Sequence, residues 1–284
     1  GQRLCLFGEV GRVADVGRQV AEVLGQRRPF GNRQALGERR FRGGQFAAPF
    51  DAERQLAQRA ADFVFLALEL LETVERFRIP FWPLEAFAQS MIYDIYHDGF
   101  PTLQGFIDYA GGASVAPASI FVHLCGLTRK DGKYLPPVFD VKRVATPCAI
   151  FSYLVHIIRD FQKDHLNNLN YFPDDLIAKY GMDRQQLLFM AKGGQITDGF
   201  RSLIRDLYEV ADFYRLKTYE MIQEIRPFVE PRGQLSLEII LALYLMVFER
   251  IDIENGTFST KELNPTWQEI KERVGQVIER FEAE

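Results

Sequence analysis

Two pairs of aspartates with the same spacing could carry chemistry in this sequence. Asp160 and Asp164 lie in the stretch "HIIRDFQKDHL", and Asp94 and Asp98 have the same separation further upstream. Two carboxylates four residues apart on a helix repel each other, and a cation between them removes that repulsion. Mg²⁺ prefers oxygen ligands, uses few carboxylates and shares phosphate oxygens of a substrate, so each pair is a candidate magnesium site.

The second pair belongs to a longer polar stripe. On a helix, Tyr153, His156, Asp160 and Asp164 follow at i, i+3, i+7 and i+11, so they share one face between apolar flanks. Arg159, next to Asp160, could offer its guanidinium fork to a phosphate. A solvated helix face with basic neighbours has the same residues, so the spacing alone leaves both interpretations open.

The elements that must position these residues are predicted to be helices, because apolar residues recur at helical spacing and no alternating strand pattern is present. The fold class expected from this pattern is all-α. The predicted helices cover residues 63–77, 80–98, 102–125, 144–168, 171–181, 196–226, 234–251 and 264–282. The second begins at Pro80 and Pro83, the third contains Gly111 and Gly112, and the fourth has Pro147 near its start. A loop is predicted over 130–140.

Composition bounds the class of protein. A chain of 284 residues with 47% apolar content can bury one large core, and a net charge of −4 argues against nucleic acid as a partner. Cys5, Cys125 and Cys148 lie far apart without CxxC spacing, so we expect no disulfide framework, no zinc site and a cytoplasmic protein. The apolar run 235–248 contains Glu238 and is shorter than a membrane span, which predicts a core helix.

Residues 1–63 differ in composition from residues 64–284. The segment contains 11 Arg and 9 Gly but no Lys, Ile, Tyr, Ser, Thr, Met, His or Trp. It is either a flexible Arg-rich arm or a stretch translated outside the native reading frame, and the second interpretation is favoured. We therefore expect an atypical segment over 1–63 and one helical domain over 64–284.

Several segments resemble the squalene and phytoene synthase family. "HIIRDFQKDHLNNLNYFPDDL" resembles the family's second aspartate-rich motif, an NIxRDxxED helix that runs on to a YxP element. "ALELLETVERFRIPFWPLEAF" resembles its IP-containing turn, "FIDYAGGASVAPASIFVHLCG" its YCxxVAGxVG segment, and "YLMVFERIDIENGTF" its late helix. These segments occur in the family's order across residues 64–284, whereas residues 1–63 are not expected to match the family.

The resemblance implies a fold, an activity and partners. The fold would be a single-domain isoprenoid synthase-type helical bundle around a central cavity. The activity would be Mg²⁺-dependent head-to-head condensation of two farnesyl or geranylgeranyl diphosphates through a carbocation, giving a squalene- or phytoene-type product of isoprenoid or carotenoid biosynthesis. NADPH would be needed if the product is squalene. The partners would be prenyl diphosphates, with peripheral membrane contact for release of the apolar product and no nucleic acid.

Individual residues carry over by position. Asp160 and Asp164 match the metal-binding aspartates and Arg159 the motif arginine. Tyr109 matches the tyrosine of the YC segment, which the family associates with rearrangement chemistry, and Tyr171 opens the YxP element. Arg159 and Tyr171 are therefore expected to bind substrate, and Tyr109, Asp160 and Asp164 to be catalytic.

Three positions depart from the family motif. Lys163 replaces a glutamate, His156 replaces the leading asparagine, and Tyr153 replaces a glutamine. All three are retained as candidate substrate-binding residues, because their side chains would face the same site. Lys163 removes one carboxylate from the motif but adds a charge that could reach a phosphate.

The partner motif is harder to place. Asp98 matches a single acidic residue of the family and Asp94 has no counterpart, while residues 1–63 offer only Asp15, with Gln19 where a second carboxylate is expected. The chain is thus a degenerate member, or its N-terminal segment is mistranslated, or Asp94 and Asp98 have become the partner ligands. Competing functions are a non-catalytic assembly factor or lipid-binding protein of the same fold and, with a poorer fit to the motifs, a head-to-tail or cyclising isoprenoid enzyme.

Overall fold

The computed structural model describes residues 69–96 and 98–283. The chain divides into two compact units, residues 1–76 and 77–284, which are described separately. Of the first unit, residues 69–76 are described, and they are helical. The predicted boundary at residue 63 and the expectation that residues 1–63 lack a metal-binding aspartate pair therefore fall outside the described residues and stay predictions.

The second unit is built from helices, which confirms the all-α class. Its elements are α3 (Trp82–Tyr96), α4 (Leu103–Ala110), the π-helix η1 (Gly111–Val115), α5 (Ala116–Cys125), β1 (Thr128–Lys130), β2 (Lys133–Leu135), α6 (Val141–Arg159), α7 (Phe161–Leu166), α8 (Asp174–Lys179), α9 (Arg184–Ala191), α10 (Asp198–Ile225), the 3₁₀-helix η2 (Arg226–Phe228), α11 (Pro231–Phe248), α12 (Thr260–Leu263) and α13 (Trp267–Ala283).

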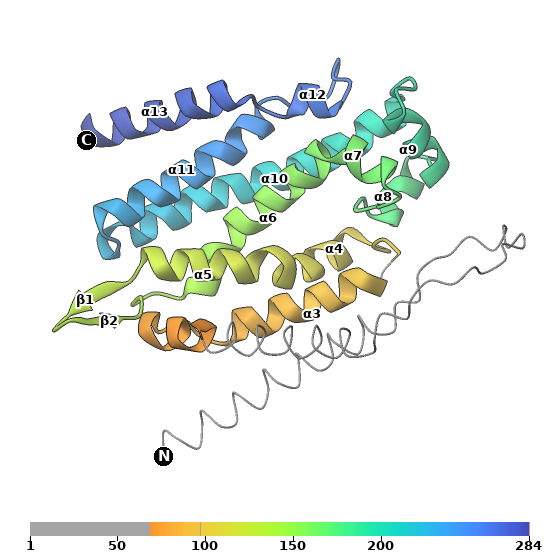
Figure 1. The fold of residues 1–284 in the computed structure, drawn as a ribbon. Coiled ribbons are helices and arrows are strands. Elements are labelled where there is room, and N and C mark those ends of the chain that lie inside the picture. The colour runs from red at the N-terminus through yellow and green to blue at the C-terminus, as the bar shows by residue number, and fades with distance from the viewer. Residues whose placement is uncertain (1–68, 97, 284) are drawn as a thin grey trace, which may run out of the picture. The chain divides into compact units, whose positions relative to one another are not determined.

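Helix α6 is the centre of this unit. It packs against α5, α10 and α11, while α3 covers α5 and α13 covers α11, as Figure 1 shows. Leu154, Val155 and Ile158 of α6 are fully buried. A helix that is apolar on most of its circumference is stable only inside a protein, so the sequence of α6 accounts for its central position.

The predicted helix over 144–168 is two helices in the structure. It begins three residues earlier than predicted because the Asp140 side chain accepts a hydrogen bond from the Arg143 amide, 3.0 Å away, and caps α6. Asp160 then separates α6 from α7 with φ −91° and ψ 4°. The junction places the first aspartate of the motif at the end of the core helix.

The predicted loop over 130–140 begins inside a short hairpin. β1 and β2 pair in antiparallel register, and Asp131 and Gly132 between them have φ of 51° and 77°. Asp-Gly is a favoured dipeptide for two-residue turns that need left-handed backbone at both positions. The prediction of an irregular loop was wrong for these residues, since the Asp-Gly signal outweighs the absence of a long strand pattern.

A glycine pair shapes the segment between α4 and α5. A Cβ at Gly112 would lie 2.5 Å from the Ala86 carbonyl oxygen of α3 and would overlap the Ser90 hydroxyl, whereas a Cβ at Gly111 would meet nothing within 4 Å. Gly112 therefore permits the close approach of α3 and η1, and the chain adopts a π-helical turn there.

These contacts predict opposite effects of two neighbouring substitutions. Gly112→Ala should lower the free energy of unfolding by roughly 1–3 kcal/mol, because α3 must move away. Gly111→Ala, the matched control, should raise it by about 0.5–1 kcal/mol through helix propensity. Urea unfolding followed by circular dichroism measures both, and equal effects at the two positions would show that the close approach is not real.

Candidate active site

Asp160 lies at the α6–α7 junction and is only 6% exposed. Arg159 donates from Nε to Asp160 Oδ1 at 2.8 Å and from Nη2 to Oδ2 at 3.0 Å, and His156 Nε2 lies 2.7 Å from Oδ2. Burial raises the pKa of the Asp160 carboxyl, but the hydrogen bonds and charges of His156 and Arg159 outweigh it, so the pKa is well below its ordinary value. Asp160 is therefore ionised, and its carboxylate is held in one orientation by these contacts.

Asp164, one turn further on in α7, has different surroundings. It is half-buried, and burial, followed by the charge of Asp160, raises the pKa of its carboxyl. Within the described ranges its carboxylate has no hydrogen-bond donor. The charges of His156, Lys163 and Arg159 lower the pKa of the Asp164 carboxyl but offset the increase only in part. A cation beside Asp164 would relieve this unfavourable potential, so the residue suits a hard metal ion.

A group of tyrosines surrounds Asp94. The Tyr109 hydroxyl donates to Asp94 Oδ1 at 3.0 Å and the Tyr171 hydroxyl to the same oxygen at 3.3 Å. Burial is the largest cause that raises the pKa of Tyr109 and Tyr171, and it contributes most to the pKa of about 12 at Tyr153. The charges of Asp94 and Asp164 also raise the pKa of Tyr153 and Tyr171, so both tyrosines lie within the electrostatic influence of the two aspartates and stay protonated.

Asp94 and Asp98 do not form a pair. Helix α3 ends at Tyr96, so the two residues no longer share a helix face. The Asp98 side chain is 94% exposed and lies 2.7 Å from Arg184 Nη1, and Nη2 of the same arginine lies 3.3 Å from Asp174 Oδ1. Asp94 thus lies with the tyrosines and Asp98 in a surface ion pair. The two pairs of aspartates have the same spacing in the sequence, but Asp94 and Asp98 do not form a site in the structure.

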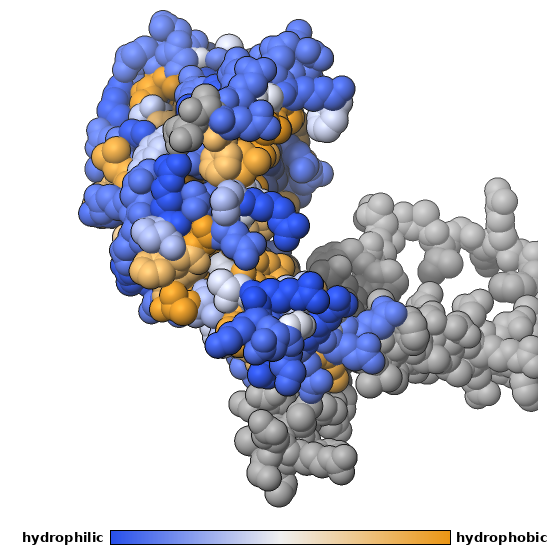
Figure 2. Space-filling view, turned by 90° about the vertical axis from the view of Figure 1, so that its left-hand side faces the viewer, coloured by the Kyte–Doolittle hydropathy of each residue, from blue (hydrophilic) through white to orange (hydrophobic). Residues whose placement is uncertain are grey.

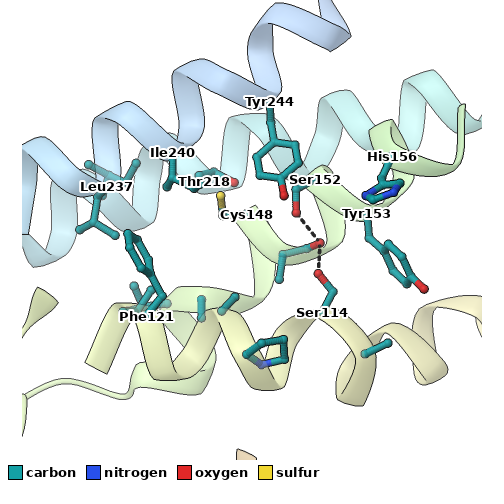
Figure 3. A pocket seen from close by; sticks show the side chains of 18 of the residues that line it. Ser114, Phe121, Cys148, Ser152, Tyr153, His156, Thr218, Leu237, Ile240 and Tyr244 are labelled. Carbon is teal, nitrogen blue, oxygen red and sulfur yellow. Dashed lines mark hydrogen bonds between the residues drawn. The ribbon is translucent and has the colours of Figure 1, made fainter. Parts of the chain in front are cut away.

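A cavity of about 460 Å³ opens between α5, α6, α10 and α11. Tyr153 and His156 lie at one end and Phe121 and Leu237 at the other, as Figure 3 shows. Ligand sites typically measure about 300–1,000 Å³, so the cavity is large enough for a small apolar molecule. His156 both lines the cavity and contacts Asp160, so this carboxylate lies next to the polar end of the cavity.

The wall of the cavity is apolar although it contains hydroxyl groups. Ser114 and Ser152 donate to the Ala149 carbonyl at 2.9 and 3.0 Å, and Thr218 donates to the Tyr214 carbonyl at 2.8 Å. Hydroxyls that are satisfied by the backbone present little free polarity to a ligand. The interior therefore suits a hydrocarbon chain better than a polar substrate.

Sequence reasoning missed most of this cavity. Tyr244 and Ile240 of α11 and Cys148 of α6 line it together with residues of α5 and α10. These positions look like ordinary core residues in the sequence, since only the packing of four helices leaves the space between them. The tyrosine that opens the segment "YLMVFERIDIENGTF" was the one available signal, because Tyr244 interrupts an apolar run.

Among the described residues, no three His, Cys, Asp or Glu side chains converge as ligands for a metal ion.

In the same part of the chain, the helices α6 and α11 are long and apolar enough to cross a membrane, judged by length and composition. Both helices belong to the bundle, since α6 is its buried core helix and α11 lines the cavity. The predicted core helix over 235–248 corresponds to α11.

The bundle defines the class of protein. A solved dehydrosqualene synthase in complex with ligand shares the fold with a TM-score of 0.58 at 15% identity, covering 81% of this chain and 78% of that one. The squalene synthase HpnC from Alicyclobacillus acidocaldarius matches at 18% identity with a TM-score of 0.48, over 70% and 75% of the two chains. The fold is the helical isoprenoid synthase bundle.

The family follows from the sequence itself. The profile described as squalene/phytoene synthase matches residues 16–269, and the chain belongs to this family of prenyltransferases. The match confirms the resemblance seen in the motifs of residues 64–284. It begins at residue 16, so part of the segment 1–63, which we expected not to match the family, matches it as well. No curated protein matches the chain.

The two motif aspartates should respond in opposite ways to neutralisation. In metal-free buffer at pH 7, Asp160→Asn should lower the free energy of unfolding by about 1–3 kcal/mol, because His156 and Arg159 lose a charged acceptor. Asp164→Asn should raise it by about 0.2–0.5 kcal/mol, because a like-charge repulsion disappears.

The pH dependence separates the two effects. A raised folded-state pKa makes the Asp164 carboxylate unfavourable above that pKa, so the benefit of Asp164→Asn should shrink as the pH falls toward the pKa of the unfolded state, about 3.9. For Asp160 the lowered pKa has the opposite sign, and its contribution is lost as the pH falls. Chemical unfolding at several pH values tests this, and loss of stability in both variants at pH 7 would contradict the assigned surroundings of Asp164.

Proposed function

We propose that this protein catalyses Mg²⁺-dependent head-to-head condensation of two farnesyl or geranylgeranyl diphosphates. The observation that carries the proposal is His156, which lines the apolar cavity and contacts the Asp160 carboxylate that Arg159 also holds. Asp164 follows Asp160 by one helical turn. A prenyl diphosphate has the same division, with a charged head and a long hydrocarbon tail. Membership of the squalene/phytoene synthase family supports the same chemistry.

The proposed reaction begins when the bond between the allylic carbon and the diphosphate breaks. The double bond of the second prenyl diphosphate attacks the resulting cation, and loss of a proton closes the ring of a cyclopropylcarbinyl diphosphate. This intermediate loses its own diphosphate and rearranges as a cation, which gives a C30 or C40 hydrocarbon by losing a proton or, for squalene, by accepting a hydride from NADPH. Preorganised positive charge lowers the energy of the departing diphosphate. In this chain Arg159 and Lys163 supply such charge. Arg159 is held in place by its ion pair with Asp160, and Lys163, which precedes Asp164, is exposed.

Mg²⁺ is proposed to bind at Asp164 and Asp160 together with water and the phosphate oxygens of the substrate. The donors fit, because Asp164 is a half-buried carboxylate without a hydrogen-bond donor in the described structure. Magnesium commonly uses one or two carboxylates plus phosphate, so a third protein ligand is not required. When bound, the ion would supply charge that neutralises the leaving diphosphate.

The cavity and the tyrosines have separate proposed roles. The apolar wall is proposed to keep water away from the carbocation. The ring faces of Tyr153 and Tyr244, which line the cavity, can stabilise the positive charge on the bound prenyl chain. Tyr109, held by Asp94, is proposed to face the rearranging intermediate as a positioned hydroxyl. A squalene product would also need a hydride from NADPH, so products formed with and without NADPH distinguish the two outcomes.

Asp94 is the proposed partner carboxylate on the opposite side of the site. It is the aspartate of the first pair that lies with Tyr109 and Tyr171, and its charge acts on Tyr153 as well. Asp98 has no role in this proposal, because it forms an exposed ion pair with Arg184.

Cytoplasmic location with peripheral membrane contact is proposed for release of the apolar product. Phe121 lines the far end of the cavity and is 36% exposed, so this end reaches the surface. Figure 2 views the side of the molecule that carries the hairpin, where apolar residues form separate patches between hydrophilic ones. Such patches favour transient contact with a membrane over stable insertion.

A second function has one observation in its favour. His156 and Arg159 already engage both oxygens of Asp160, and Lys163 stands where the family motif has a carboxylate. A site whose Asp160 oxygens are already occupied by protein donors would also suit a non-catalytic member of the family. Such a member would act as an assembly factor or a lipid-binding protein. Such a protein would bind a prenyl chain in the cavity without cleaving the diphosphate.

Turnover by the purified chain decides between the two functions. With Mg²⁺ and farnesyl or geranylgeranyl diphosphate, we expect pyrophosphate release and a C30 or C40 hydrocarbon, measured by a coupled phosphate assay and mass spectrometry. Asp164→Asn should reduce the rate about 100-fold. The exposed turn variant Asp131→Asn is the control, since asparagine tolerates its left-handed backbone. Tight binding of the substrate without any product would favour the non-catalytic function.

The first aspartate pair gives a separate prediction. Asp94→Asn should lower the rate at least about tenfold, because Tyr109 and Tyr171 lose their charged acceptor. Asp98→Asn removes only a surface ion pair and should change the rate less than about twofold. Steady-state kinetics on both variants checks this, and equal losses would mean that the two aspartates act together despite their separation.

A further inference from the structure

His156 occupies an unusual place in the site. Its Nε2 lies 2.7 Å from Asp160 Oδ2, one helical turn away, and its ring meets the Tyr153 ring edge-on at 6.2 Å. The side chain is 42% exposed and lines the apolar cavity. In the part of the chain that the structure describes, His156 is the one residue that both lines this cavity and contacts the Asp160 carboxylate.

The hydrogen bonds of Asp160 occupy one of its two carboxylate oxygens, Oδ2, completely. Each carboxylate oxygen offers about two lone pairs. Oδ1 accepts one bond from Arg159 Nε, whereas Oδ2 accepts from both Arg159 Nη2 and His156 Nε2. The acceptor capacity of Oδ2 is therefore filled, and a metal ion that binds there must displace a donor.

His156 is the donor that can leave. Arg159 holds Asp160 through two parallel hydrogen bonds and is less exposed, with 23% of its side chain accessible, against 42% for His156. A bidentate pair is harder to break than a single hydrogen bond. The imidazole can move toward solvent or the cavity mouth while Arg159 keeps the carboxylate in place.

We propose that His156 is a latch, which competes with a divalent cation for Oδ2 of Asp160. The imidazole and the ion exclude each other at that oxygen, so His156 sets the cation affinity of the site. The proposal rests on the proposed function only in placing Asp160 at the cation site. A carboxylate only accepts hydrogen bonds, so the contact requires the charged ring or the neutral tautomer that carries its proton on Nε2. In both forms the imidazole competes with the ion for the same oxygen.

Mn²⁺ binding to the metal-free full chain tests the latch at a single pH. The electron paramagnetic resonance signal of free Mn²⁺ falls as the ion binds, which gives the dissociation constant without any substrate. His156→Asn, which places the family's asparagine in the motif, should bind Mn²⁺ about five- to tenfold more tightly than the parent chain, because one hydrogen bond to a charged acceptor no longer opposes the ion.

Lys163→Gln is the matched control, because it removes a nearby positive charge that has no contact with Asp160. It should raise the affinity less than His156→Asn does. Thermal unfolding checks that both variants fold, and His156→Ala serves as the second variant if His156→Asn does not.

Three results would overturn the latch. Weaker Mn²⁺ binding by His156→Asn would mean that the imidazole is itself a ligand. Unchanged affinity, or no binding by either chain, would mean that the contact does not limit the ion. An equal gain in Lys163→Gln would assign the effect to general electrostatics. Turnover is measured separately, so loss of the latch leaves the proposed function standing.

Discussion

The desolvated carboxylate of Asp160 is the constraint on which the site depends. A charged group that is removed from water must be compensated by hydrogen bonds and opposite charge, and Arg159 and His156 provide both. This requirement fixes the guanidinium at the end of α6 and turns the imidazole toward the carboxylate. The break between α6 and α7 at Asp160 then places Asp164 on a separate short helix, where its carboxylate accepts no hydrogen bond from the described residues and nearby positive charges compensate it only in part.

The rest of the bundle follows from the burial of α6. Its apolar circumference requires neighbours on several sides, and α5, α10 and α11 supply them. Where small residues line the facing helices, as at Ala113, Ala118 and Ala149, the packing leaves the cavity open. The hydroxyls in its wall donate to the backbone, so the space remains apolar up to Tyr153 and His156. A charged end and an apolar interior thus arise from one helix.

Much of this arrangement could be predicted from the sequence, but for different physical reasons. Helical spacing predicts the long helices, and the order of the motifs predicts the family. The separation of Asp94 from Asp98 could not be predicted, because it depends on the end of α3 at Tyr96 and on Arg184, which lies far away in the sequence. Helix α9 was not predicted, although the capping box of Asp183 and Gln186 marks its start. The cavity depends on packing between helices that are far apart in the sequence, and Tyr244 in the apolar run of α11 was its one local signal.

The central claim is that one end of the cavity binds a diphosphate while its interior binds the prenyl chain. A crystal structure of the chain with Mg²⁺ and a non-hydrolysable thiodiphosphate analogue of farnesyl diphosphate tests it most directly. We predict the diphosphate beside Asp164 and Arg159, and the hydrocarbon chain along α6 toward Phe121 and Leu237. A chain bound outside this cavity, or a diphosphate bound away from Asp164 and Arg159, would contradict the account.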